Sequence, residues 1–149
     1  MDSAILKEMT AALVDMGSVL PESFCNMTLR RLESLGCQVD ASQIWNLAFC
    51  VRKSEVEVLD YCHIDLIPVV LHPMLCDRAC GRYLYDRKQS GTLDIESIDL
   101  SGVLTSLSEG DVKVSFNAAT SDEAKLDALL GLMMNTGKGQ LSCYRKVRW

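Results

Sequence analysis

The sequence has few of the residue patterns that accompany metal binding. It contains only two histidines among 149 residues. One of them, His72, stands four and eight residues before Cys76 and Cys80, so the three side chains could share one face of a helix. A zinc site needs four ligands in a tetrahedral arrangement, and its usual ligand pairs are more closely spaced. We therefore predict an apolar helix face with a histidine at its edge, and neither a metal nor a cofactor.

Signs of catalysis are equally scarce. A cysteine nucleophile needs a histidine base and a third group that orients the base, and nothing near His63 supplies that set. No carboxylate lies in an apolar run that would raise its pKa as an acid catalyst requires. Gly137, Lys138 and Gly139 lack the rest of the phosphate-loop pattern and its preceding strand. We predict that the chain is not an enzyme.

Long apolar runs are missing too. No stretch approaches the roughly 18 apolar residues that a membrane-spanning helix requires, and Asp2 follows Met1 where a signal peptide would be basic. The seven cysteines are odd in number, scattered and without a C-x-x-C pair, whereas a disulfide framework favours an even count. We expect a chain that stays in the cytoplasm in which it is made, away from membranes, with most cysteines reduced and in the core.

Charge is unevenly distributed along the chain. Residues 92–127 hold eight acidic residues and two lysines, whereas residues 138–149 hold four basic residues and no acidic one. An acidic body with a basic end favours a directed electrostatic contact with another protein or with a neighbouring copy. A nucleic-acid-binding protein would instead carry its positive charge on the folded face.

Hydrophobic periodicity predicts helices over 3–16, 22–35, 41–62, from about 73 to 88, and over 121–135. In the helix over 41–62 the charged residues that we expect to face solvent are Arg52, Lys53, Glu55 and Glu57. A glycine inside a helix costs about 1 kcal/mol relative to alanine. Gly81, inside the fourth helix, therefore predicts that another helix crosses close to it.

The remaining segments predict a hairpin and an arm. Alternating apolar residues at 103–107 and 112–116 flank the turn Glu109-Gly110-Asp111, as in a β-hairpin over 103–116. Gly137 and Gly139 predict a hinge over 135–140. The expected fold is mainly α: a small bundle of about four to five helices with one protruding hairpin over 1–137, and a hinge with an extended basic-aromatic arm over 138–149.

The arm ends on residue types that dominate protein interfaces. Tryptophan and arginine each bury a large area with directional contacts, and the chain closes on YRKVRW. Chain ends are usually disordered in solvent, which is the alternative. We favour docking onto a partner.

Three stretches resemble a known family. They are IPVVLHPMLCDRACGRYL at 67–84, SLSEGDVKVSF at 106–116 and YRKVRW at 144–149. Together they look like the head–tail connector, or adaptor, proteins of long-tailed bacteriophages and prophages. The resemblance covers about residues 40–149, and residues 1–39 depart from it.

The resemblance implies a structural virion protein in the neck of the particle, assembled in the cytoplasm of a bacterial host. About twelve copies would form a ring that docks on the portal protein and joins the head to the next connector, a stopper or a tail protein, with DNA only passing through the channel. The implied portal-binding residues are Tyr144, Arg145, Lys146, Arg148 and Trp149. The implied loop facing the channel or the neighbouring subunit is Glu109, Gly110 and Asp111.

Two other roles fit the same residues. One is a tail-completion or stopper protein of the same virion, and the other is a small helical regulatory protein that binds a host partner. Binding to the portal separates the connector from both.

Overall fold

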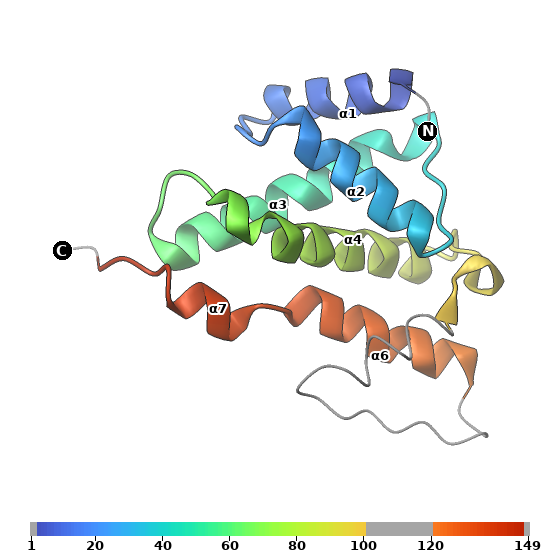
Figure 1. The fold of residues 1–149 in the computed structure, drawn as a ribbon. Helices are drawn as coiled ribbons and strands as arrows, with labels where there is room; N and C mark the ends of the chain where they lie inside the picture. Colours follow the sequence, from blue (N-terminus) through green and yellow to red (C-terminus); the bar gives the residue numbers. More distant parts are fainter. Residues whose placement is uncertain (1–2, 101–120, 148–149) are drawn as a thin grey trace.

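The computed structural model describes residues 3–100 and 121–147, which are mainly helical (Figure 1). The α-helices are α1 (Ser3–Asp15), α2 (Glu22–Ser34), α3 (Ile44–Cys62), α4 (His72–Gln89), α6 (Asp122–Asn135) and the short α7 (Lys138–Ser142). Single 3-10 turns are η1 (Ala41–Gln43), η2 (Val69–Leu71) and η3 (Ile95–Ser97). The predicted helices are thereby confirmed. The predicted hairpin over 103–116, with Glu109, Gly110 and Asp111, lies outside the described residues, and no strand occurs among those that are described.

Helix α4 is the centre of the bundle. It packs against α2, α3 and α6, while α1 packs on α2 and α3. In Figure 1 α1 lies along the top of the molecule, and α6 and α7 lie below α4. The apolar residues that recur at helical spacing on the inner faces of these helices are buried. They are Ile44, Leu47, Ala48, Val51, Val58 and Cys62 of α3, Met74, Leu75, Ala79, Cys80, Tyr83 and Leu84 of α4, and Leu126, Leu129, Leu130 and Met133 of α6. Burial of these faces stabilises the bundle through the hydrophobic effect.

The helix boundaries follow local side-chain chemistry. The Asp40 carboxylate accepts a hydrogen bond from the backbone N–H of Ser42, and the Ser121 hydroxyl accepts one from Ala124 N–H, so both satisfy free donors at a helix start. Pro73 stands in the first turn of α4, where its missing N–H costs nothing.

The prediction that a helix crosses close to Gly81 is confirmed. A Cβ atom at this position would lie 2.7 Å from Cβ of Met133 on α6. Real Cβ atoms do not approach one another so closely, so the absence of a side chain is what lets α4 and α6 pack at this distance.

The prediction that Glu55 faces solvent is wrong. Its side chain is fully buried, and its two carboxylate oxygens accept hydrogen bonds from Ser18 Oγ at 3.1 Å and from Arg52 at 2.5 Å. The turn between α1 and α2 brings Ser18 over this part of α3. Periodicity along α3 carries no information about that turn, whereas a buried carboxylate needs such partners.

The cysteines pack as core residues. All seven are free thiols; Cys143 is exposed and the other six are buried, which confirms the predicted location of most of them. Burial raises the pKa of the Cys50 thiol to about 12, and the nearby Asp86 carboxylate acts in the same direction. His72 is buried with its ring edge-on to Phe24, at 5.4 Å between centroids.

Within residues 3–100 and 121–147, no helix has the length and apolar character needed to cross a membrane. No three potential histidine, cysteine or carboxylate ligands cluster there to hold a metal ion.

Candidate docking site at the C-terminal end of the bundle

The C-terminal segment is fixed against the end of α3. Leu141 of α7 is buried, and its carbonyl oxygen accepts a hydrogen bond from Cys62 Sγ at 3.5 Å. Four residues after the end of α7, the backbone N–H of Lys146 donates to the carbonyl oxygen of Cys62 at 2.7 Å. The segment as far as Lys146 therefore lies on the body of the bundle, at the left-hand end in Figure 1.

The structure differs from the predicted hinge over 135–140. Helix α6 ends at Asn135 and α7 begins at Lys138, so only Thr136 and Gly137 separate them. Gly137 has φ +81°, and a Cβ there would lie 2.3 Å from Cγ of Met74. Thr136 is held by a 2.7 Å hydrogen bond from Arg78 Nε. The link is a turn packed on α4, and the expected extended arm begins with a helix.

Three of the five predicted portal-binding residues are described. Tyr144 packs partly buried against the core, Lys146 is exposed, and the Arg145 guanidinium lies 5.1 Å from the centre of the Tyr61 ring. A cation over an aromatic face is an attractive contact that also positions the cation. The other two, Arg148 and Trp149, lie outside the described residues. The structure thus brings Tyr144, Arg145 and Lys146 together beside α3.

Sequence reasoning missed the apolar surface around these residues. Three apolar residues of the segment between α3 and α4 are more than half exposed, and Val147 of the C-terminal segment is 76% exposed. The three are Leu66 (64%), Val69 (77%) and Val70 (60%). Leu66 and Pro68 also line a shallow hollow of about 320 Å³ with Tyr144 and Lys146. Grouped exposed apolar side chains rimmed by polar ones mark interaction sites. The signal was present in the run DLIPVV, whose apolar residues lie between helices.

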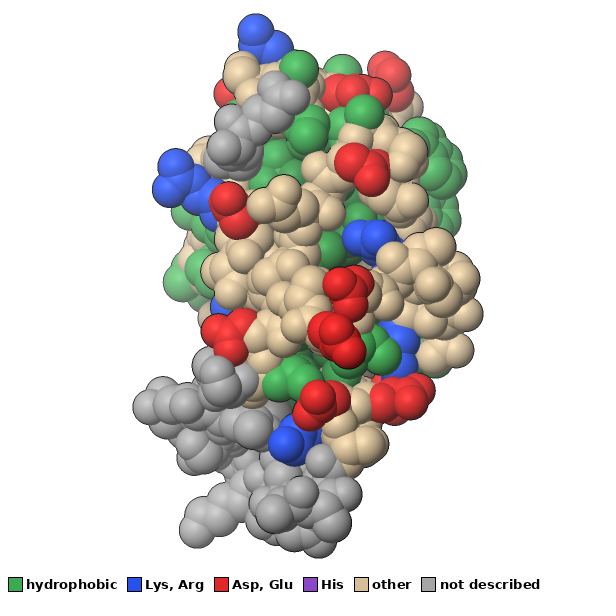
Figure 2. Space-filling view, turned by 90° about the vertical axis from the view of Figure 1, so that its right-hand side faces the viewer, with side chains coloured by type: hydrophobic (Ala, Val, Ile, Leu, Met, Phe, Trp, Pro, Cys, Tyr) green, Lys and Arg blue, Asp and Glu red, His purple; other side chains and the backbone are tan. Residues whose placement is uncertain are grey.

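The basic residues of the C-terminal segment and the acidic residues around η3 lie at opposite ends of the bundle. The basic residues Lys138, Arg145 and Lys146 belong to α7 and the segment after it, at the left-hand end in Figure 1. Helix η3 and the start of α6 lie at the right-hand end, and they and the residues flanking η3 carry Asp94, Glu96, Asp99, Asp122 and Glu123. Figure 2 views that end directly and shows acidic side chains scattered over it, with basic and apolar ones between them. The acidic end is partly neutralised, since Lys88 of α4 pairs there with Glu123 and Asp127.

This arrangement is suited to binding. The C-terminal end offers exposed apolar area for contact and cations whose charge orients an approaching acidic surface. Comparison with protein-family models, with curated proteins and with solved structures found no match. The assignment of a role therefore rests on the sequence motifs and on the geometry of this end.

Proposed function

We propose that the chain is a ring-forming head–tail connector of a tailed bacteriophage, which docks on the portal and joins the head to the next connector or tail protein. The resemblance of residues 67–84, 106–116 and 144–149 to that family supports this role. The observation that carries the proposal is the C-terminal end of the bundle, where Lys146 and Tyr144 line one hollow together with the exposed Leu66.

Docking at this end would use two kinds of contact, apolar and electrostatic. Leu66, Val69 and Val70 give apolar area, which supplies affinity when it is removed from water. Arg145 and Lys146 attract an acidic surface over a distance and raise the rate of encounter. Because the Arg145 side chain already lies over Tyr61, less of its conformational freedom is lost on binding.

Ring assembly uses the rest of the molecule. About twelve bundles side by side would form the wall of a channel, with each subunit repeating the same contact to its neighbour. Acidic side chains facing that channel repel DNA phosphates, so DNA passes without adhering. Glu109, Gly110 and Asp111 stay the candidates for a loop at the channel or at the neighbouring subunit.

The test is co-expression of the chain with the portal protein from the same genome, followed by size-exclusion chromatography. We expect the two to elute together as a ring complex. Elution of the chain as a free monomer or dimer would contradict the proposal and favour the regulatory role. Elution with a tail protein but without portal would favour a stopper.

A truncation locates the contact. Removing 140–149 would delete the buried Leu141 and the Lys146–Cys62 hydrogen bond, so a loss of binding could reflect unfolding. Removing only 147–149 keeps both. We expect this shorter truncation to weaken portal binding, and Glu96→Gln, an exposed change in η3, to leave binding intact. Equal binding by the truncated and full chains would remove 147–149 from the docking surface.

A further inference from the structure

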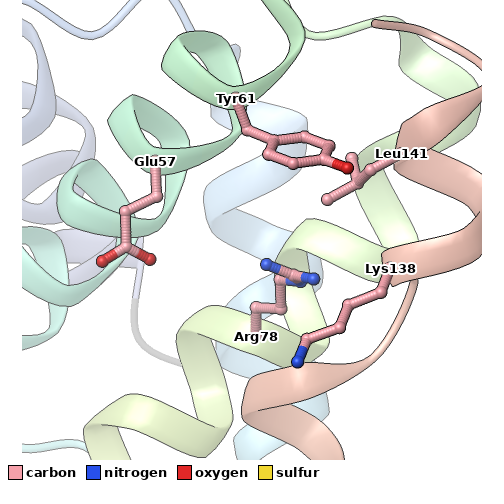
Figure 3. A pocket seen from close by; sticks show the side chains of 5 residues that line it. All are labelled: Glu57, Tyr61, Arg78, Lys138 and Leu141. Carbon is pink, nitrogen blue, oxygen red and sulfur yellow. The ribbon is translucent and has the colours of Figure 1, made fainter.

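A pocket of about 300 Å³ opens beside the C-terminal segment, between α3, α4 and α7. It is lined by Glu57, Tyr61, Arg78, Lys138 and Leu141. Figure 3 shows the Arg78 guanidinium reaching from α4 into the middle of this group, with the Lys138 side chain below it and the Tyr61 and Leu141 side chains above. The residues come from three helices, so the packing of the bundle shapes the pocket.

The carboxylate that lines the pocket forms its ion pair with a different residue, outside the pocket. Glu57 Oε2 pairs with Arg82 NH2 at 3.0 Å. Arg78 uses Nε to donate to Thr136 O at 2.7 Å. Among residues 3–100 and 121–147, neither Arg78 nor Lys138 has a carboxylate oxygen within ion-pair distance. Burial lowers the pKa of Arg78 because a charge withdrawn from water is less stable, and the nearby Glu57 carboxylate opposes this shift without cancelling it.

The walls decide what kind of anion fits. Tyr61 and Leu141 present apolar surface beside the two cations. A free phosphate would leave that surface uncovered, and the Glu57 carboxylate would repel a doubly charged ion. A glutamate or aspartate next to a large apolar side chain fits both the cations and the apolar wall. Its carboxylate, with a single charge, meets the guanidinium of Arg78, while the apolar neighbour covers Tyr61 and Leu141.

The pocket is continuous with the docking surface. The Tyr61 ring that lines it also carries the Arg145 guanidinium, and Leu141 belongs to the helix that leads into Tyr144. A partner segment that contacts Arg145 is therefore next to a residue of the pocket wall, Tyr61.

We propose that this pocket receives an acidic-apolar segment of the partner docked at the C-terminal end, with Arg78 and Lys138 binding its carboxylate. The inference rests on the proposed function, which makes that partner the portal protein. It adds a specific anchor within the docking surface, where a buried charge-assisted contact determines how long the complex lasts.

The decisive variant is Lys138→Glu. Lys138 is exposed and has no ion pair in the described part of the chain, so reversing its charge should leave folding unchanged. We expect portal binding to weaken about tenfold or more, as for a charged contact that becomes a repulsion. The matched control is Lys7→Glu, an equal charge reversal at an exposed position of α1, which should change affinity by no more than about twofold. Circular dichroism and thermal unfolding check that both variants are folded.

A second variant separates shape from charge. Arg78→Lys keeps the positive charge but removes the planar fork that binds a carboxylate through two parallel hydrogen bonds. We expect weaker portal binding from Arg78→Lys, with a faster dissociation rate. If the wild-type chain binds portal and Lys138→Glu binds as tightly, the pocket is not the anchor while the proposed function stands. If the wild-type chain does not bind portal at all, the proposed function fails and the inference fails with it.

Discussion

Replacing Gly81 by alanine combines two effects of opposite sign at one position. Alanine is the better helix former, so the change should stabilise α4 by about 1 kcal/mol if nothing else altered. The new Cβ, however, would lie 2.7 Å from Cβ of Met133 and 3.2 Å from the backbone nitrogen of Met134. Both atoms are close to the backbone of α6 and cannot rotate away, so the helices must separate.

Gly131 provides a matched control on the partner helix. It too lies inside a helix, and a Cβ there would have no atom within 4 Å. Gly131→Ala should therefore gain the helix preference alone, about 0.4 to 1 kcal/mol. Overpacking a close contact typically costs 1–3 kcal/mol, so Gly81→Ala should be less stable than Gly131→Ala by roughly that amount.

The assay is urea unfolding of the wild type and both variants, followed by helical circular dichroism. We expect the midpoint to rise for Gly131→Ala and to fall for Gly81→Ala, or at least to rise less, with slopes that stay equal. Equal stabilisation by the two alanines would refute the close crossing of α4 and α6.

The remaining predictions concern buried groups of α3. Glu55→Ala should lower the free energy of unfolding by about 2 kcal/mol, because Ser18 loses a buried partner and Arg52 loses its ion pair. The control Glu57→Ala breaks an exposed pair and should lower it by less than about 1 kcal/mol. Equal losses in urea unfolding would contradict the buried role of Glu55. Because the folded-state pKa of Cys50 is raised to about 12, unfolding releases its proton above about pH 9, and stability should fall with rising pH by up to about 1.4 kcal/mol per unit. Unfolding measured from pH 7 to 10 should show a smaller fall for Cys50→Ala than for the wild type, and identical slopes would contradict the assignment.

Much of the fold could be predicted because it depends on patterns local to the chain. The apolar residues of α3, α4 and α6 repeat at helical spacing. Asp40 and Ser121 mark helix starts, because their side chains accept hydrogen bonds from backbone N–H groups two or three residues later. Even the close crossing at Gly81 could be predicted locally. A glycine inside a helix lowers helix stability, so its presence there indicates a packing requirement.

Other features depend on what lies across the bundle. Glu55 is buried because Ser18, 37 residues earlier, covers it. The turn at Gly137 is packed because Met74 of α4 stands against it. No spacing rule within one helix contains either fact.

The candidate site also combines features visible in the local sequence with features that depend on contacts between helices. The arm was located by its composition, with Arg145 and Lys146 among its residues. Its contact with Tyr61 and the pocket containing Arg78 and Lys138 arise only when α3, α4 and α7 meet. Leu66 and Val69 have apolar side chains typical of a core, and only the structure shows them exposed.

The most direct test of the central claim is quantitative mass spectrometry of purified phage particles from the genome that encodes the chain. A connector predicts that the chain is present in intact particles at the same copy number as the portal, about twelve per virion in a matched ring. It should also stay with the portal when heads are separated from tails. Absence of the chain from purified particles that contain portal would contradict the account.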